Sequence, residues 1–542
     1  IPFIPGSSAI NTITINGNNN ELIFAGGNAT NWATLNLNGT DHLTVKNLVI
    51  TGTALTNCFG VHLMGNATYN TFDSCTISVP ITPIVTTVIG VSISGSKILY
   101  STTGINASNN LFNRCTVNGG YYAMSFYGYT TIDTNNRNNS ITNCIVRDAY
   151  AYGIYNIYQG YSTISNNIIE RPNRTNSTTT GGVILSTNCA NILVEKNRVR
   201  NLFGAFPGST SAAYGLYCSS SAASSGFENK FINNVVSDIK SNGTIYAIYT
   251  LSSVYVQIYH NTINLDDQTA TAGTTYGVYS TFASPTGVEV VNNIIHITRT
   301  GTGTKYCLYF GGPLVSNYND LYINSPAGVN GIGYFTSSFT TLADWQTANG
   351  GIWDQNSVDF QPNFLNVNTN NFKPTNTLLD NLGTNVGVTT DIVNKPRSVS
   401  TPDIGAYEIT LSPIDLGAIT ISPSNPNFNG CYDTAQTITV QVQNYGTDTL
   451  RFGLTPATVT CYISGAISDT VVASITDTLL PGATKWVTIN AGVNMSAIGT
   501  YNILARTNIA GDGDTLNDFM AAAESRTAVG LSGGTISSST TA

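Results

Sequence analysis

The sequence predicts an all-β chain in which a parallel β-helix of about ten coils is followed by a β-sandwich. The composition, a short repeat in the first 320 residues and a change of pattern near Leu411 lead to this prediction. Only 9% of the 542 residues are charged and 41% are hydrophobic, which is enough for a folded core. Asn, Gly, Thr and Ser are abundant, whereas Met occurs 4 times. Residues that suit strands and turns therefore prevail, and almost no helix is expected.

A short phrase recurs along the first part of the chain, with Asn or Cys in its second position and β-branched or other apolar residues after it. The second positions lie on average about 30 residues apart, which is typical of a solenoid coil. They are predicted to form one column along the axis: Asn47, Cys75, Cys115, Cys144, Asn167, Asn197, Asn234, Asn261, Asn293 and Asn319. Stacked Asn side chains can hydrogen-bond from coil to coil. The three cysteines are predicted to be small buried members of this column rather than disulfide partners.

A second phrase, built on a pair such as Gly215-Leu216, follows the first in most coils. Strands at fixed positions joined by variable turns are what a parallel β-helix requires, since each coil must pair with the coil beneath it. We predict that this helix spans residues 1–410 and that 336–410 form its C-terminal cap, because the last coil otherwise exposes an unpaired edge. Alternating strands with Pro and Gly turns predict a sandwich over 411–525. Residues 526–542 are interpreted as a linker or the start of a further module.

The charge and the cysteines exclude several classes of protein. With 21 Lys+Arg against 29 Asp+Glu, the net charge of −8 argues against binding to nucleic acid. No apolar run is long enough to span a membrane. The start at Ile1-Pro2-Phe3 has neither Met nor a signal peptide, which predicts a processed chain or a fragment. The 9 cysteines include no CxxC pair and are odd in number, so most are expected to be buried thiols.

The first part of the chain resembles the right-handed parallel β-helix repeat proteins of the bacterial cell surface. The similarity is most specific in the closing segment, with Pro362-Asn363-Phe364 and Asp403-Ile404-Gly405-Ala406-Tyr407-Glu408. After Leu411, Asn444-Tyr445-Gly446-Thr447 and Gly511-Asp512-Gly513-Asp514 are similar to immunoglobulin-like adhesion modules. Such modules are typical of large proteins exported by the type IX secretion system of gliding bacteria. The resemblance implies a right-handed helix, an immunoglobulin-like β-sandwich, a location at the cell surface or outside the cell, and the type IX machinery as a partner.

Charged side chains follow the repeated Asn or Cys at a common offset of three or four residues: Arg147, Asp148, Glu170, Arg171, Arg200, Asp238 and His296. This offset predicts a strip near one edge of a sheet. In one interpretation Arg147, Arg171 and Arg200 bind an acidic polysaccharide, as a lyase or hydrolase acting on it would require. The favoured interpretation is a solvated ladder of alternating charges. No compact pair of an acid and a base emerges, so no catalytic residue is assigned and an enzyme is not favoured.

Pairs of tyrosines three residues apart recur around the second phrase, in five coils: Tyr152 and Tyr155, Tyr214 and Tyr217, Tyr246 and Tyr249, Tyr276 and Tyr279, and Tyr306 and Tyr309. Because side chains of a strand alternate between its faces, two positions three apart are expected to point in opposite directions. One column would then face outward, and the predicted ligand-binding set is Tyr155, Tyr217, Tyr249, Tyr279 and Tyr309. Such a column could stack on sugar rings or contact a protein, or it could only protect the sheet.

The sandwich region contains the weaker candidates for metal and disulfide sites. Asp512, Asp514 and Asp518 offer hard oxygen ligands, so calcium is the only cofactor considered, although a plain acidic turn is favoured. Cys431 and Cys461 are the disulfide candidates, on the assumption that their strands lie opposite each other.

Three functional hypotheses follow. The leading one is an extracellular structural or adhesive protein, a β-helix stalk or blade that binds surface glycans or other cell-surface proteins. The second is a polysaccharide lyase or glycoside hydrolase that acts on an acidic polysaccharide through the charged strip. The third is a passive filament component or secretion cargo whose tyrosine face meets another protein.

Overall fold

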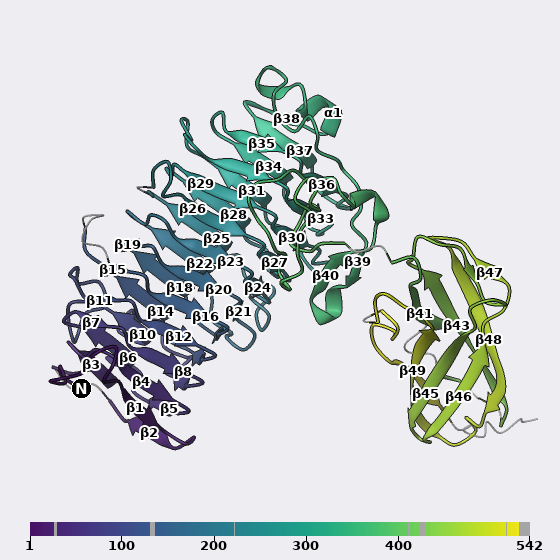
Figure 1. Cartoon of the computed structure of the whole chain (residues 1–542), viewed down its shortest axis with the longest axis horizontal. Coiled ribbons are helices and arrows are strands. Elements are labelled where there is room, and N and C mark those ends of the chain that lie inside the picture. Colours follow the sequence, from purple (N-terminus) through teal and green to yellow (C-terminus); the bar gives the residue numbers. More distant parts are fainter. Residues whose placement is uncertain are drawn as a thin grey trace, which may run out of the picture. The chain divides into compact units, whose positions relative to one another are not determined.

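A computed structural model shows two compact units that consist almost entirely of β-strands (Figure 1). It describes residues 1–26, 30–130, 136–221, 223–409, 412–422, 429–430, 432, 434–515 and 517–529. The first unit comprises residues 1–362 and 378–408, and the second comprises 363–377 and 409–542. Among the described residues no helix is long and apolar enough to cross a membrane, since the α-helix α1 (Leu342–Trp345) has only 4 residues.

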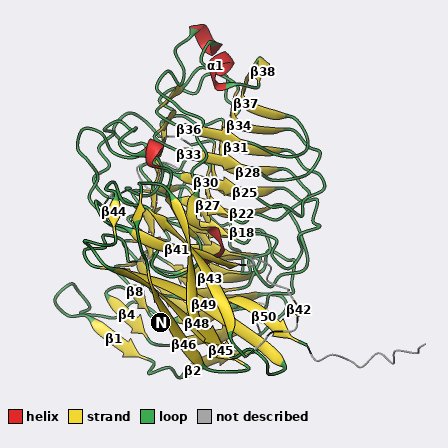
Figure 2. Cartoon of the chain, turned by 90° about the vertical axis from the view of Figure 1, so that its right-hand side faces the viewer, coloured by secondary structure: helices red, strands yellow, loops and turns green. Residues whose placement is uncertain are grey.

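The first unit is a parallel β-solenoid, which confirms the predicted fold class. Its three long sheets, here called A, B and C, contain 12, 11 and 11 strands. Successive strands of each sheet belong to successive coils and pair in parallel, as the rungs from β18 to β37 show in Figure 2. At the end of sheet A, the strand β38 pairs with β37 in antiparallel orientation.

The strands of sheet A, in order of coils, are β3 (Ala33–Asn38), β6 (Cys58–Met64), β10 (Val88–Ile93), β14 (Tyr122–Tyr127), β18 (Tyr152–Ile157), β22 (Thr180–Ser186), β25 (Ala213–Ser219), β28 (Ile245–Leu251), β31 (Thr275–Ser280), β34 (Lys305–Phe310), β37 (Asn330–Phe335) and β38 (Ser337–Phe339). Sheet B consists of β1 (Ile13–Asn16), β4 (Leu43–Lys46), β8 (Thr71–Asp73), β12 (Leu111–Asn113), β16 (Ser140–Thr142), β20 (Thr163–Ser165), β23 (Leu193–Glu195), β26 (Asn229–Ile232), β29 (Val256–Tyr259), β32 (Glu289–Val291) and β35 (Val315–Asn317). Sheet C consists of β2 (Glu21–Phe24), β5 (Val49–Gly52), β9 (Thr76–Ser78), β13 (Thr116–Asn118), β17 (Ile145–Arg147), β21 (Ile168–Glu170), β24 (Arg198–Arg200), β27 (Val235–Ser237), β30 (Thr262–Leu265), β33 (Ile294–Ile297) and β36 (Asp320–Ile323). Two short pairs lie at the turns, β7 (Ala67–Thr68) with β11 (Ala107–Ser108) and β15 (Asn136–Arg137) with β19 (Gln159–Gly160).

The corner between sheets B and C is a turn of two residues, and its second residue forms the predicted Asn column. Asn167 Nδ2 donates to Asn197 Oδ1 at 2.9 Å, and the same bond joins the later members at 3.0–3.1 Å: Asn197, Asn234, Asn261, Asn293 and Asn319. Each accepting Oδ1 also receives the backbone N–H of the Asn one coil earlier. The stacked column is therefore confirmed over these coils.

The cysteine part of the column is confirmed as well, with one error at its start. The N–H of Cys144 donates to Asn167 Oδ1 at 2.8 Å, and the seven described cysteines of the solenoid are buried and form no disulfide. Asn47, however, is not a member. The strand register aligns Asn47 with the residue before Cys75, so Leu48 occupies the column in that coil.

The first residue of the same corner has positive φ in every coil from the second onward: Asn47, Ser74, Arg114, Asn143, Asn166, Lys196, Asn233, His260, Asn292 and Tyr318. Non-glycine residues pay roughly 1–2 kcal/mol for this conformation. The hydrogen bonds of the neighbouring Asn column offset this cost because they satisfy backbone groups at the turn.

The segment predicted as the cap divides into three parts with different roles. Residues 336–362 close the last coil: Trp345 and Trp353 are buried against Phe310, with ring centroids 5.6 and 5.2 Å away. Residues 363–377 belong to the second unit. This region also contains three short 3-10 helices, η2 (Ala348–Gly350), η3 (Val367–Thr369) and η4 (Thr377–Leu379).

Residues 378–408, which contain the predicted closing motif, run along the side of the solenoid rather than over its end. They bind the positive-φ corner residues of successive coils. Lys196 Nζ donates to Thr390 Oγ1 at 2.9 Å, and the Arg397 guanidinium donates to Asn233 Oδ1 at 2.8 Å. Asn292 O accepts from the N–H of Gly405 at 2.7 Å. This segment is a lateral strap that joins the coils.

The second unit has two sheets around a shared apolar core. One sheet contains β41 (Leu416–Ser422), β43 (Gln436–Asn444) and β48 (Thr484–Val493), and the other contains β42 (Asn429–Gly430), β50 (Glu524–Ala528), β49 (Gly499–Ile509), β45 (Ala457–Gly465) and β46 (Asp469–Ser474). Smaller pairs are β44 (Leu450–Arg451) with β47 (Thr478–Leu479) and the hairpin of β39 (Phe364–Asn366) and β40 (Asn371–Pro374). All pairings but that of β42 with β50 are antiparallel among the described strands. The first residues of the predicted linker are part of β50, and 530–542 lie outside the described residues.

Candidate functional site

The outer face of sheet A carries two parallel columns of tyrosines over its last coils. We call these residues the tyrosine face: Tyr214, Tyr217, Tyr246, Tyr249, Tyr276, Tyr279, Tyr306, Tyr309 and Tyr334. The strand register pairs Tyr214 with Tyr246 and Tyr217 with Tyr249, and it continues both columns coil by coil. The second column contains four of the five tyrosines predicted as ligand-binding. The fifth, Tyr155, occupies the same column one coil before Ile184.

Tyrosines three residues apart lie on the same face, so the prediction of opposite faces is wrong. The ring centroids of Tyr214 and Tyr217 are 4.9 Å apart. Between them, Gly215 and Leu216 are consecutive and both buried. A Cβ on Gly215 would lie 2.6 Å from Cγ1 of the core residue Val236, so this position points inward. Two inward residues in succession change the phase of the alternation and return Tyr217 to the outer face.

The rings of the tyrosine face pack against one another both along and across the strands. Along the second column the centroid distances are 4.8 Å for Tyr217 and Tyr249, 5.0 Å for Tyr249 and Tyr279, and 4.6 Å for Tyr279 and Tyr309. Tyr309 and Tyr334 continue the column at 4.4 Å. These separations lie at the close end of the range for favourable aromatic pairs. The result is a continuous aromatic surface rather than isolated side chains.

The tyrosine face is accessible and uncharged. All its members except Tyr306 retain intermediate exposure, and the turn of residues 205–208 at its edge is exposed. Burial among neighbouring rings raises the pKa of Tyr217, Tyr246, Tyr276 and Tyr279 to about 12, so these phenols stay neutral far above physiological pH. The strands β25, β28, β31, β34 and β37 contain no Asp or Glu. Their one charged residue, Lys305, is buried and donates to three backbone carbonyls.

The charged strip of sheet C is largely occupied by its own pairs. Glu170 Oε1 accepts from Arg147 at 2.7 Å, and Glu170 Oε2 accepts from Arg200 at 3.1 Å. The predicted alternating ladder is therefore present at these three positions. Arg171 is not part of it: its side chain is buried, and its guanidinium donates to the backbone carbonyls of Ala149 and Arg174. The prediction that Arg171 faces a ligand is wrong, because the strand ends at Glu170 and the chain turns inward.

The acidic turn of the second unit does not gather metal ligands. Asp514 forms an ion pair with Lys373, Asp518 pairs with Arg506 at 3.4 Å, and Asp512 accepts the N–H of Leu416. Across the described residues no group of three or more His, Cys, Asp or Glu side chains is placed to hold a metal ion. For the predicted disulfide, Cys431 lies outside the described residues, and Cys461 is buried in the sandwich core. That pairing stays a prediction.

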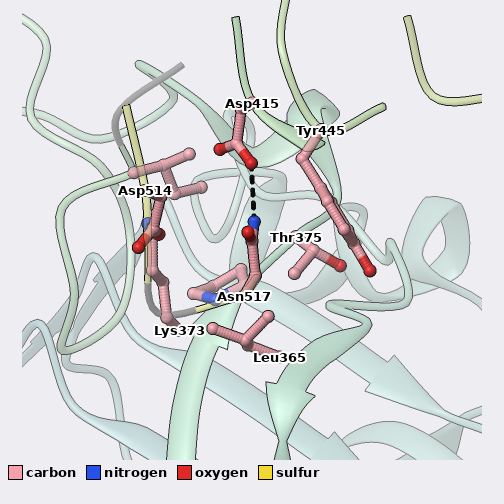
Figure 3. A pocket seen from close by; sticks show the side chains of 9 residues that line it. Leu365, Lys373, Thr375, Asp415, Tyr445, Asp514 and Asn517 are labelled. Atoms are coloured by element: carbon pink, nitrogen blue, oxygen red, sulfur yellow. Dashed lines mark hydrogen bonds and ion pairs between the residues drawn. The ribbon is translucent and has the colours of Figure 1, made fainter. Parts of the chain in front are cut away.

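The second unit contains a small pocket beside the hairpin of β39 and β40 (Figure 3). Asn517 Nδ2 donates to Asp415 Oδ1 at 2.6 Å in this pocket, and Lys373 and Asp514 line its side. Burial, with Asp512 and Asp514 nearby, raises the pKa of Asp415 to about 6. These contacts hold the hairpin to the sandwich, and we assign the pocket no ligand.

The raised pKa of Asp415 predicts a pH-dependent stability of the second unit. A carboxyl with a higher pKa in the folded state binds more protons when folded, so its contribution is complete below pH 3.8 and is lost as the pH rises through 6. We expect Asp415→Asn to raise the free energy of unfolding at pH 7 by about 3 kcal/mol and to leave it nearly unchanged at pH 4. Labelling of the buried Cys461 thiol in urea, corrected for the intrinsic pH dependence of the thiol, measures this. An exposed counterpart, Asp469→Asn, should have no such effect, and equal effects of the two substitutions would contradict the assignment.

The tyrosine pairs are evident in the sequence, but the joint surface that they form is not. The predicted ligand-binding set left out the first column, including Tyr246 and Tyr276, because the period-two rule placed them on the other face. It also left out Tyr334, because a glycine, Gly331, takes the place of the first tyrosine in that coil. The signal that could have corrected this is the Gly or Ala that stands after the first tyrosine, since a small residue allows two successive inward positions.

Together these observations define a parallel β-solenoid protein with an uncharged aromatic face, joined to a smaller β unit. No protein-family model matches the sequence, and no curated protein matches it.

Proposed function

We propose that the protein is an extracellular structural and adhesive protein whose solenoid binds neutral glycans through the tyrosine face. The observation that carries this proposal is the accessible double column of packed tyrosines on strands without a carboxylate. A tyrosine offers an apolar ring face to the C–H side of a sugar and a hydroxyl that donates and accepts hydrogen bonds. Because the rings are already packed in place, little side-chain entropy is lost on binding.

The charge of the protein selects among glycans. A net charge of −8 and phenols that remain neutral provide no attraction for an acidic polysaccharide. The basic side chains predicted to grip such a polymer are either paired with Glu170 or, as in the case of Arg171, buried. Neutral polysaccharides therefore fit the surface better than acidic ones, and binding without turnover fits better than lyase or hydrolase chemistry.

The remaining parts of the molecule are assigned structural roles in this proposal. The solenoid acts as a rigid stalk or blade, and we infer right-handed coiling from its resemblance to bacterial cell-surface β-helix proteins. The second unit is proposed to be an immunoglobulin-like spacer, and export by a type IX machinery follows from the same resemblance. A filament built by end-to-end stacking is less favoured, because Trp345 and Trp353 close the last coil.

The proposal is tested by retention of the protein on insoluble polysaccharides. Wild-type protein is expected to bind at least one neutral polymer, such as cellulose, chitin or xylan, and to release no soluble product. The double variant Tyr249→Ser/Tyr279→Ser should bind at least tenfold more weakly, because it removes two adjacent rings of one column. Tyr249→Phe keeps the ring and separates the contribution of the hydroxyl from loss of packing.

The matched control is Tyr69→Ser, which removes an exposed tyrosine outside the tyrosine face and should leave binding unchanged. Retention only on acidic polymers such as alginate or polygalacturonate, or release of oligosaccharides, would contradict the proposal and favour the enzyme. Capture of another surface protein with no affinity for glycans would assign the same face to a protein partner.

A further inference from the structure

The outer face of sheet A continues beyond the tyrosine face toward the N-terminus, where its character changes. The strand register places His62, Ser92 and Ser125 in the same column as Tyr155. All three have an exposure of 0%. The neighbouring column at these coils is apolar, with Phe59, Ile89 and Tyr122 at successive positions. The column that contains tyrosines in the later coils therefore contains polar side chains in these earlier coils.

These polar side chains have unused hydrogen-bonding capacity. His62 Nδ1, Ser92 Oγ and Ser125 Oγ are buried and have no hydrogen-bond partner in the structure. A buried polar atom without a partner costs roughly 1–3 kcal/mol. Three such atoms in one column lower the stability of the fold as long as they have no partner. A ligand that supplies hydrogen bonds to them would remove this cost.

One segment of the chain, residues 94–104, lies over this part of the face. His62 Nε2 is 3.2 Å from both the carbonyl oxygen and Oγ of Ser94. The ring of Tyr100 packs edge-on against Tyr122 at 5.4 Å and against Tyr127 at 6.5 Å. The Tyr100 ring thus contacts a tyrosine on each side of Ser125 along β14.

The two ends of residues 94–104 lie close together. Ser96 and Leu99 form a tight antiparallel bridge, and the N–H of Gly95 donates to Thr102 O at 2.9 Å, so the segment is a small closed hairpin. Its tip is turned away from the sheet, since Leu99 is 48% exposed. Glycines at positions 95 and 104 bound the hairpin and allow its ends to change conformation. Of its apolar side chains, Tyr100 packs against the buried cluster of Phe59, Ile89 and Tyr122, whereas Ile98 and Leu99 are exposed, which is typical of segments that open locally.

We propose that residues 94–104 form a movable cover over a polar subsite, in which His62, Ser92 and Ser125 bind the hydroxyl groups of a neutral glycan that also lies on the tyrosine face. This proposal rests on the proposed function. A sugar hydroxyl donates and accepts at once, and it therefore matches a neutral imidazole nitrogen and two serine hydroxyls. Burial lowers the pKa of His62 to about 4, which keeps its imidazole neutral at physiological pH. In the closed form Tyr100 takes the place on sheet A that a sugar ring takes in the open form.

The test replaces Ser96–Ser101 by Gly-Gly, which removes the cover at a point where the two ends are already hydrogen-bonded. Binding of a soluble neutral oligosaccharide by calorimetry is expected to become about tenfold tighter, because the cover no longer competes for the subsite. Adding His62→Phe in this shortened protein should reverse the gain. His296→Phe replaces another buried histidine, on sheet C, and should not. In the full chain, Tyr100→Ala weakens the cover without deletion and should give a smaller gain in affinity.

The outcomes separate this inference from the proposed function. If the tyrosine-face double variant loses binding while the shortened protein binds like wild type, the function stands and the inference is overturned. If only the shortened protein binds the oligosaccharide, and His62→Phe abolishes that binding, the cover and its subsite are supported. If neither protein binds any neutral glycan, both proposals are overturned.

Discussion

Replacing Asn234 by Ala is expected to lower the free energy of unfolding of the solenoid by about 4 kcal/mol. The side chain has no exposure and makes four hydrogen bonds. Its Nδ2 donates to Val194 O at 2.9 Å and to Asn261 Oδ1 at 3.0 Å, and its Oδ1 accepts from N and Nδ2 of Asn197, both at 3.0 Å. Truncation removes the acceptor of the Asn197 backbone N–H and of one Nδ2 hydrogen of Asn197, and it removes the Nδ2 donor to Val194 O, whereas Asn261 Oδ1 keeps the backbone N–H of residue 234. Each buried group left without a partner costs roughly 1–3 kcal/mol.

The appropriate measurement is the urea concentration at the midpoint of unfolding of the solenoid. Unfolding is monitored by chemical labelling of the buried thiols of Cys218 and Cys307. Asn324→Ala is the matched control, because Asn324 is exposed and should contribute less than about 0.5 kcal/mol. Asn234→Cys should cost less than Asn234→Ala, since cysteines occupy the same column in earlier coils. Equal midpoints for Asn234→Ala and Asn324→Ala would show that the column contributes nothing to stability.

Trp345→Ala is expected to destabilise the last coils by about 4 kcal/mol and to cause aggregation. The indole is fully buried, and its ring packs against Trp353 at 5.1 Å and Phe310 at 5.6 Å. Its Nε1 donates to Asp354 Oδ2 at 2.8 Å. Asp354 also accepts from Asn319 Nδ2 at 3.0 Å, so the cap provides the final acceptor of the Asn column. Loss of the indole therefore exposes the apolar core at the end of the solenoid and removes a hydrogen-bond donor to Asp354.

Light scattering and hydrogen exchange measure the two parts of this effect. Exchange should increase in β34 and β37, while β14 and β18 keep their protection, because a solenoid coil contacts only its neighbours. Trp486→Ala, at a half-exposed tryptophan of the second unit, is the control and should change neither. A uniform loss of protection along the whole solenoid would contradict a local role for the cap.

The repeat made the solenoid predictable because its residues act through backbone geometry that is the same in every coil. Asn167 and Asn234 lie where the spacing placed them. The error at Asn47 arises because an Asn favours two adjacent positions of the same turn, the column itself and the positive-φ residue before it. A single coil does not distinguish these positions, whereas the register of the paired strands does. The shorter column of Asn70, Asn110 and Asn139, joined at 3.0 and 3.1 Å, was missed because the lengths of its turns vary.

The tyrosine face was predictable only in part. Composition and spacing identified its residues except Tyr334, but the direction of each side chain depends on the two inward residues between the tyrosines. Arg171 shows the same limit, since a shift of one position past the end of a strand changes an exposed cation into a buried one. The lateral course of residues 378–408 depends on contacts between residues far apart in the sequence, such as Asn233 and Arg397 at a separation of 164 positions, and no local pattern indicates these contacts. The position of residues 94–104 over sheet A could not be predicted for a related reason, because a turn that folds back over a sheet has no periodic pattern in the sequence.

Chemical footprinting of the tyrosines tests the central claim most directly. The protein is treated with a nitrating reagent, with and without a saturating neutral polysaccharide that retains it, and modified peptides are quantified by mass spectrometry. The account predicts that the glycan protects Tyr217, Tyr249, Tyr279 and Tyr309 severalfold and leaves Tyr69 unchanged. Equal nitration of these four tyrosines in the free and bound protein would contradict it, because a glycan that leaves them accessible binds elsewhere.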